Sequence, residues 1–174
     1  MLKKMKITSK RKVVIIIGLL SVISLGYIYF SKSVEKIPAF SYIEISTKAN
    51  FTANDLKNNY KKVFIYFSPS CDDCSGLFEF IRTRKDKFVD SQILMVSTRS
   101  LTSLQQYAVE NDVKRLKNIT ILYDSTHKFV RDFHLGSLIS LPTILVFNSN
   151  NTLVFNGGDK DFRDLVEQKN IVQN

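Results

Sequence analysis

Residues 63–74 of the 174-residue chain read Val-Phe-Ile-Tyr-Phe-Ser-Pro-Ser-Cys-Asp-Asp-Cys, and the expected architecture follows from this stretch. The apolar run 63–67 predicts a strand that is covered on both faces. Ser-Pro-Ser ends the run, and the cysteines open a predicted helix. Cys71 and Cys74 are the only cysteines of the chain. Their spacing puts both on one face of the helix, where they can close a disulfide across one turn.

The two cysteines are expected to differ in reactivity. Cys71 lies at the start of the predicted helix, where free N–H groups and the helix dipole favour a thiolate. Cys74 continues an apolar stripe with Leu77, Phe78 and Ile81, which predicts that its sulfur is buried. Cys71 is therefore the candidate attacking thiol of a catalytic redox pair, and Cys74 is the candidate resolving thiol.

The same spacing is compatible with a structural disulfide, with two buried thiols and with half of a zinc site. Zinc normally takes four protein ligands in a structural site. The sequence has no second cysteine pair and no close histidine pair to complete one. We therefore predict no metal site, and no cofactor other than the Cys71–Cys74 disulfide itself. A structural disulfide and a pair of buried thiols stay open as alternatives.

The N-terminal region predicts the compartment. Residues 1–12 carry six Lys or Arg and no acid, and residues 13–30 form an uncharged apolar run of eighteen. As a helix this run spans about 27 Å, enough for a bilayer core. No small-residue cleavage pattern follows it, so an uncleaved transmembrane anchor is favoured over a cleaved signal peptide. The basic end stays in the cytoplasm, and everything after residue 30 is expected in the periplasm or another extracytoplasmic space, as in a single-pass membrane protein.

The rest of the chain divides into a tether, residues 31–40, and one compact domain, residues 41–174. Six of the 25 Lys and Arg residues precede residue 13, whereas all 16 acidic residues follow residue 30. The exported part therefore has nearly balanced charge, and it shows no basic patch with interleaved aromatic residues. These observations exclude a nucleic-acid-binding protein.

Apolar periodicity predicts alternating strands and helices along the domain. The expected strands are 42–45, 63–67, 92–97, 119–124, 143–147 and 152–155; the expected helices follow the cysteines and cover 101–116, 128–133 and 161–168. Residues 51–56 are expected to form a capped helical turn, and Ser70 with Asp73 resembles a capping box before the helix that carries the cysteines. This order predicts an α/β domain with a mostly parallel sheet, an antiparallel edge and helices on both faces.

The strand into Cys71-x-x-Cys74 and the Leu141-Pro142-Thr143 turn together resemble the thioredoxin superfamily. The additional strand and helix at 92–116 are similar to the middle section of its TlpA-like branch, whose membrane-tethered members are thiol–disulfide oxidoreductases. The resemblance implies a thioredoxin-like mixed sheet, a cis peptide bond at Pro142, and a substrate-binding role for the backbone of Leu141. It also implies partners: extracytoplasmic proteins with thiols or disulfides, and an upstream dithiol that donates electrons.

The chain departs from the family pattern near the cysteines. A tryptophan, an acid and a glutamate found in members of the family are replaced by Ser70, Ile65 and Leu77. Asp72 and Asp73 lie between the cysteines, and their charges are expected to raise the pKa of the Cys71 thiol. A less stable thiolate makes the dithiol a better electron donor, so we expect a reductant of protein disulfides.

Three other functions compete with this one. The first is a thioredoxin-fold module that only binds a peptide near Leu141 and Pro142, with a permanent structural disulfide. A peroxidase normally has a Pro-x-x-x-Thr-x-x-Cys context, and no threonine precedes Cys71 in that way. Copper-delivering relatives of the fold have three residues between their cysteines, so His127 and His134 are expected to be ordinary surface residues.

Overall fold

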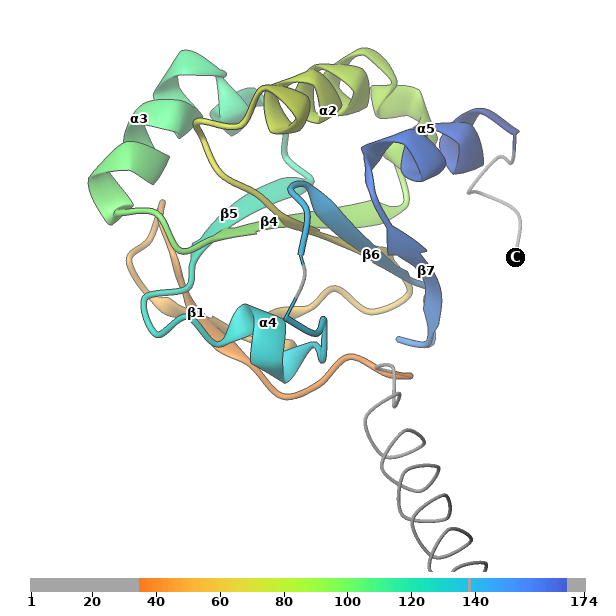
Figure 1. Ribbon diagram of the computed structural model, residues 1–174, viewed down its shortest axis with the longest axis horizontal. Coiled ribbons are helices and arrows are strands. Elements are labelled where there is room, and N and C mark those ends of the chain that lie inside the picture. The colour runs from red at the N-terminus through yellow and green to blue at the C-terminus, as the bar shows by residue number, and fades with distance from the viewer. Residues whose placement is uncertain (1–34, 138, 169–174) are drawn as a thin grey trace, which may run out of the picture. The chain divides into compact units, whose positions relative to one another are not determined.

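The computed structural model describes residues 35–137 and 139–168, which form one mixed β-sheet with helices on both sides (Figure 1). The strands are β1 (Ser41–Glu44), β2 (Asn50–Thr52), β3 (Lys61–Tyr66), β4 (Ser91–Ser97), β5 (Ile119–Tyr123), β6 (Thr143–Phe147) and β7 (Leu153–Gly157). The α-helices are α2 (Asp72–Thr83), α3 (Leu101–Glu110), α4 (Phe129–Asp132) and α5 (Asp159–Gln168). Short 3-10 helices lie between them: η1 (Ala53–Asp55), η2 (Lys85–Phe88) and η3 (Val113–Arg115).

The predicted cytoplasmic tail and membrane anchor, residues 1–12 and 13–30, lie outside the described residues. Most of the predicted tether at 31–40 is described, from residue 35 onward. Among the helices of the described part, none combines the length and the apolar character that a membrane crossing requires.

The strands follow the order β2-β1-β5-β4-β3-β6-β7. β3 pairs with β4, and β4 with β5, in parallel, so that Ile65 lies opposite Met95 and Met95 opposite Ile121. The other four pairings among the described strands are antiparallel. The expectation of a mostly parallel sheet is therefore wrong. Short turns join β1 to β2 and β6 to β7, and such turns force antiparallel pairing. β1 and β6 also run antiparallel to their inner neighbours β5 and β3, so parallel pairing is confined to β3, β4 and β5 at the centre.

One face of the sheet, called the helical face below, is covered by α2, α3 and α5 (Figure 1). Its strand residues are aliphatic: Val63, Ile65, Ile93, Met95, Ile119, Ile121, Ile144 and Val146. The predicted apolar stripe of α2 packs against them and is buried: Cys74, Leu77, Phe78 and Ile81. The helix that carries the cysteines is thus fixed to the sheet by the stripe that includes Cys74.

The opposite face, called the aromatic face below, is covered by α4 and by the segment before β1. It is a layer of rings: Phe40, Tyr42, Phe51, Phe64, Phe129, Phe133 and Phe147. The Phe133 ring centroid lies 4.5 Å from that of Phe129 and 4.8 Å from that of Phe64. Because residues of β3 alternate between the faces, Phe64 joins this layer while its neighbours Val63 and Ile65 join the other.

Two predicted elements differ in extent. The capped turn expected at 51–56 is shorter, because Asn50–Thr52 pairs with β1 as β2 and only Ala53–Asp55 forms the turn, with Thr52 as its cap. The helix expected over 101–116 ends at Glu110. Asp112 adopts a left-handed conformation with φ of 50°, which an α-helix does not accommodate, and η3 follows.

Candidate active site

The cysteines lie where β3 passes into α2, at the carboxyl ends of the parallel strands. The N–H of Phe67 prolongs the ladder by donating to the carbonyl of Val96 at 3.0 Å. The chain then turns, and the Cys71 N–H donates to the carbonyl of Ser68 at 3.1 Å. This turn ends the strand and places Cys71 at the N-cap of α2, which begins at Asp72.

Cys71 itself caps α2, so the predicted capping box of Ser70 and Asp73 is wrong. The Sγ of Cys71 accepts a hydrogen bond from the Cys74 N–H at 3.2 Å. The Ser70 hydroxyl instead hydrogen-bonds with the Ser68 hydroxyl, at 3.0 Å. The sulfur of Cys71 therefore lies among the free N–H groups of the first turn, which favours its thiolate once the disulfide is reduced.

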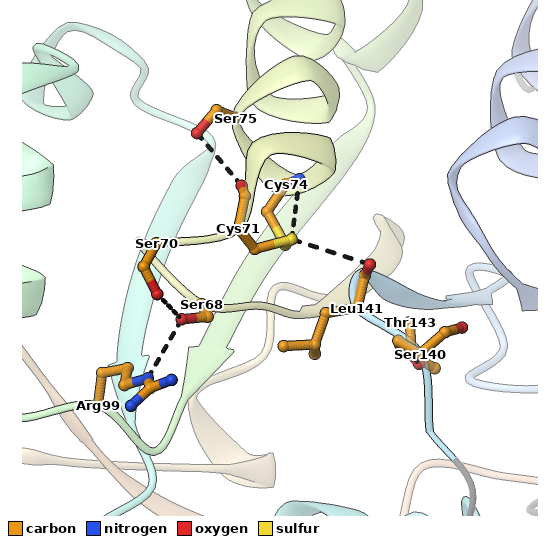
Figure 2. Close-up of a disulfide and its surroundings, with 9 residues drawn as sticks. All are labelled: Ser68, Ser70, Cys71, Cys74, Ser75, Arg99, Ser140, Leu141 and Thr143. Carbon is orange, nitrogen blue, oxygen red and sulfur yellow. Dashed lines mark hydrogen bonds between the residues drawn. A yellow bond between two sulfur atoms is a disulfide. The ribbon is translucent and has the colours of Figure 1, made fainter.

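The two cysteines form a disulfide, with their Cα atoms 5.2 Å apart (Figure 2). Cys74 is only 2% exposed and belongs to the apolar cluster of the helical face. Cys71 is partly buried and lies at the edge of the same cluster. The predicted contrast in burial is thus confirmed, and Cys71 is the more accessible of the two cysteines.

The loop before β6 lies beside the disulfide. The Leu141–Pro142 peptide bond is cis, as the resemblance implied. The carbonyl oxygen of Leu141 lies 3.8 Å from the Sγ of Cys71 (Figure 2). The Thr143 hydroxyl donates to the carbonyl of Ser140 at 2.6 Å. The backbone of Leu141 is thus held next to the accessible sulfur.

A third segment, the loop between β4 and α3, reaches the site through Arg99. Its Nε donates to Ser68 Oγ at 3.2 Å, and Ser68 Oγ lies 3.0 Å from Ser70 Oγ (Figure 2). The Arg99 N–H donates to Ser97 Oγ at 3.3 Å. The hydrogen bond between Arg99 and Ser68 was not predicted from the sequence, because 31 positions separate the two residues. One signal was present: Arg99 follows a strand whose carboxyl end must lie beside that of β3 in a parallel pair.

The predicted tuning residues, Asp72 and Asp73, occupy the first turn of α2 and are exposed. Carboxylates there interact favourably with the helix dipole and so stabilise the helix start. Both directly follow Cys71 in sequence, and both are open to solvent, which screens their charges. Their effect on the thiol is therefore expected to be small.

The buried cluster to which Cys74 belongs is apolar apart from one hydroxyl, that of Tyr107. Burial raises the pKa of Tyr107 to about 12, so this hydroxyl stays protonated at neutral pH. Its ring packs against Phe67 and Phe78, and the hydroxyl has no hydrogen-bond partner within the described part of the chain. Apolar surroundings disfavour a thiolate at Cys74 relative to Cys71.

The histidines lie away from the cysteines in sequence and flank α4. His127 and His134 are both exposed, which confirms the expectation that they are surface residues. Within residues 35–137 and 139–168, no group of three His, Cys, Asp or Glu side chains is arranged to hold a metal ion.

Comparison with known proteins gives a family match and several structural neighbours. The sequence model of the AhpC/TSA family matches residues 34–156, most of the chain. A putative thioredoxin from Neisseria meningitidis has a TM-score of 0.60 and 23% identity, over 78% of this chain and 88% of that one. A thioredoxin family thiol:disulfide interchange protein from Chlorobium tepidum has a TM-score of 0.58 and 15% identity, over 80% and 98%.

A thiol peroxidase from Chromobacterium violaceum has a TM-score of 0.59 and 16% identity, over 80% of this chain and 87% of that one. At such identities these structures show a shared fold. Comparison with curated proteins finds no match.

Proposed function

Because this chain belongs to the AhpC/TSA family and carries a Cys-x-x-Cys disulfide in a thioredoxin-like fold of the TlpA-like type, we propose that it reduces disulfides in proteins outside the cytoplasm. The observation that carries the proposal is the contrast between Cys71 and Cys74. One is accessible at a helix start, and the other is 2% exposed in the core. An attacking thiol and a resolving thiol need this contrast, whereas a purely structural disulfide does not.

In the proposed reaction the Cys71 thiolate attacks one sulfur of the partner's disulfide, and the other partner sulfur leaves as a thiolate that takes up a proton. A mixed disulfide then joins the partner to Cys71. Cys74 loses its proton, attacks the Cys71 sulfur and releases the second partner thiol. Two electrons and two protons have passed to the partner. An upstream dithiol must then reduce the Cys71–Cys74 disulfide again.

The loop at Leu141 and Pro142 supplies the proposed docking contact for the partner. The Leu141 carbonyl lies 3.8 Å from Cys71 Sγ, so a partner strand that pairs with the backbone of Leu141 has its own sulfur next to Cys71. Such pairing uses main-chain hydrogen bonds and therefore accepts partners of different sequence.

Trapping of mixed disulfides tests the proposed roles. In Cys74→Ala the resolving thiol is missing, so the mixed disulfide at Cys71 should persist and be recovered with partner proteins. In Cys71→Ala no such adduct should form, because the remaining sulfur is buried. The double variant is the control for non-specific adducts. Adducts with Cys71→Ala and none with Cys74→Ala would reverse the assignment.

Membrane attachment through residues 13–30 is part of the proposal and has its own test. The protein should stay with membranes after carbonate washing, and protease should reach the domain only from the extracytoplasmic side. Recovery of a soluble product that starts near Ser31 would show a cleaved signal peptide instead.

Hydroperoxide reduction is a second candidate. Ser68 stands three residues before Cys71, at the sequence position of the threonine in the peroxidase pattern, whereas Phe64 stands at the position of its proline. One structural neighbour is a thiol peroxidase. In this reaction Cys71 would become a sulfenic acid as the peroxide bond breaks and an alcohol or water leaves, and Cys74 would then form the disulfide with loss of water. Treatment of Cys74→Ala with peroxide and a sulfenic-acid reagent tests this candidate. Labelling at Cys71 would support hydroperoxide reduction, and the absence of labelling would exclude it.

A further inference from the structure

Arg99 differs from every other arginine in the described part of the chain. The five others each form an ion pair with a carboxylate: Arg82, Arg84, Arg115, Arg131 and Arg163. Arg99 is exposed and pairs with none of the described carboxylates; its Nε donates to the Ser68 hydroxyl. Its charge is thus left uncompensated at the rim of the site.

The position of Arg99 is fixed by buried groups. Its backbone N–H donates a hydrogen bond to the hydroxyl of Ser97, which is fully buried. Its Nε donates to the hydroxyl of Ser68, which is 4% exposed. The carbonyl of the same Ser68 accepts the hydrogen bond of the Cys71 N–H. The guanidinium is therefore tied to the backbone that positions the accessible cysteine, and it lies on the other side of that cysteine from Leu141 (Figure 2).

We propose that Arg99 binds a carboxylate of the partner protein, on an acidic residue beside the cysteine that exchanges with Cys71. This inference rests on the proposed exchange function and names the class of partner. With Nε engaged by Ser68, the two terminal nitrogens of the guanidinium still carry donors, and their planar arrangement matches a carboxylate. Ser70, with its small side chain, stands where the family has a bulky tryptophan, and Arg99 is exposed to solvent on this side of Cys71.

The charges around Cys71 also favour one orientation of the bound partner. Asp72 and Asp73 repel an acidic residue on the α2 side, whereas Arg99 attracts one on the side of Ser70. Opposite charges on the two sides of one thiol determine the register and orientation of the partner more than they raise its affinity. Arg99 is therefore a specificity-determining residue rather than a group that takes part in bond exchange.

The test uses the full-length reduced protein in detergent and three disulfide-linked peptides. The peptides differ only in the residue beside the cysteine: Glu, Gln or Lys. We expect the second-order rate constant for the Glu peptide to exceed that for the Gln peptide by about five-fold, the size of an exposed ion pair, and to fall with added salt. Arg99→Gln should bring the Glu-to-Gln ratio to about one, and Arg99→Glu should make the Lys peptide the fastest. Arg115→Gln, at an exposed arginine of η3, should keep the wild-type ratio.

The outcomes separate the inference from the function on which it rests. A wild-type ratio near one, or a ratio that Arg99→Gln leaves unchanged, overturns carboxylate recognition. Equal slowing of all three peptides in Arg99→Gln, together with a changed Cys71 thiol pKa, also overturns it, because the arginine then acts on the thiol. Failure of the wild-type protein to exchange with any of the peptides counts against the proposed function itself.

Discussion

On the helical face, aliphatic strand residues pack under α2, and the same stripe of α2 carries Cys74 into the core. On the aromatic face, seven rings from the strands, from α4 with its C-cap and from the segment before β1 pack together, and neither cysteine belongs to this cluster. Both faces bury a large apolar layer, but only the helical face is continuous with the disulfide. This difference indicates that residues of the aromatic face stabilise the domain, whereas residues of the helical face also set the chemistry.

The largest expected effect on stability is at the centre of the aromatic face. Phe133 is 1% exposed and lies between the rings of Phe64 and Phe129. Phe133→Ala should lower the free energy of unfolding by about 3–5 kcal/mol, because it removes buried ring surface and leaves a cavity. The midpoint potential of the folded protein should not move. A potential shifted together with stability would show that the aromatic face is coupled to the disulfide. Val154→Ala, at a residue that is 59% exposed, is the matched control and should change little.

Leu77 gives the corresponding test on the other face. It is 1% exposed and lies one turn after Cys74 on the buried stripe. Leu77→Ala should lower the free energy of unfolding by about 2–5 kcal/mol. Unlike Phe133→Ala, it should also change the midpoint potential, because α2 loosens beneath the disulfide. Chemical denaturation and redox titration of the same preparation check both expectations, and an unchanged potential would remove the distinction between the faces.

A smaller effect is expected at Lys62, whose side chain is directed to the aromatic face by the alternation of β3 and is 2% exposed. Burial lowers the pKa of Lys62 below its ordinary value, and none of the ion pairs of the described residues involves it. The unfolded state thus binds the proton more tightly than the folded state. The buried charge therefore costs stability at neutral pH, and this cost disappears as the pH rises from the lowered value towards the unfolded value of about 10.4.

Lys62→Met should accordingly raise the free energy of unfolding at pH 7 by about 1 kcal/mol and reduce its increase between neutral and alkaline pH. The exposed Lys117 is the matched control, since Lys117→Met removes a charge without a burial cost. Denaturation curves at several pH values give the answer. A Lys62→Met protein that is less stable at every pH would mean that the ammonium group makes favourable interactions.

The smallest effect concerns the charges beside the accessible thiol. Asp72→Asn with Asp73→Asn should lower the Cys71 thiol pKa by about half a unit for each carboxylate, since both are exposed and screened. The potential should move towards the oxidising end. Asp86→Asn, beyond the far end of α2, should leave the pKa as it is. Thiol alkylation rates as a function of pH measure the value; a rise in the double variant would have the wrong sign for a Coulombic effect.

Local signals in the sequence predict much of the site. The apolar run of β3, the Cys74 stripe and the difference between the cysteines follow from period and position, and the cis bond before Pro142 follows from the family resemblance. β2 escapes such prediction because a three-residue edge strand has no measurable period. Serine is the commoner N-cap residue and therefore points to Ser70 as the cap of α2, whereas Cys71 takes that place.

The contribution of Arg99 could not be predicted from spacing. Its hydrogen bond to Ser68 depends on the parallel register of β3 and β4, which brings the loops after both strands together. In the sequence, Ser70 differs from the family only as a missing tryptophan. The structure shows that the Ser70 hydroxyl hydrogen-bonds with the Ser68 hydroxyl, which the sequence does not indicate. Contacts between loops at one end of a sheet are fixed by tertiary pairing rather than by any local pattern.

Redox titration of the full-length protein tests whether Cys71 and Cys74 are a working pair that donates electrons. The protein would be equilibrated with dithiol and disulfide buffers, and its free thiols counted by alkylation. We expect a reversible two-electron transition with a midpoint well below about −120 mV, the value of a strong oxidant such as DsbA. A midpoint potential near that value would contradict the proposal that the protein acts as a reductant. A disulfide that no dithiol reduces would contradict the exchange reaction itself and favour a binding module with a structural disulfide.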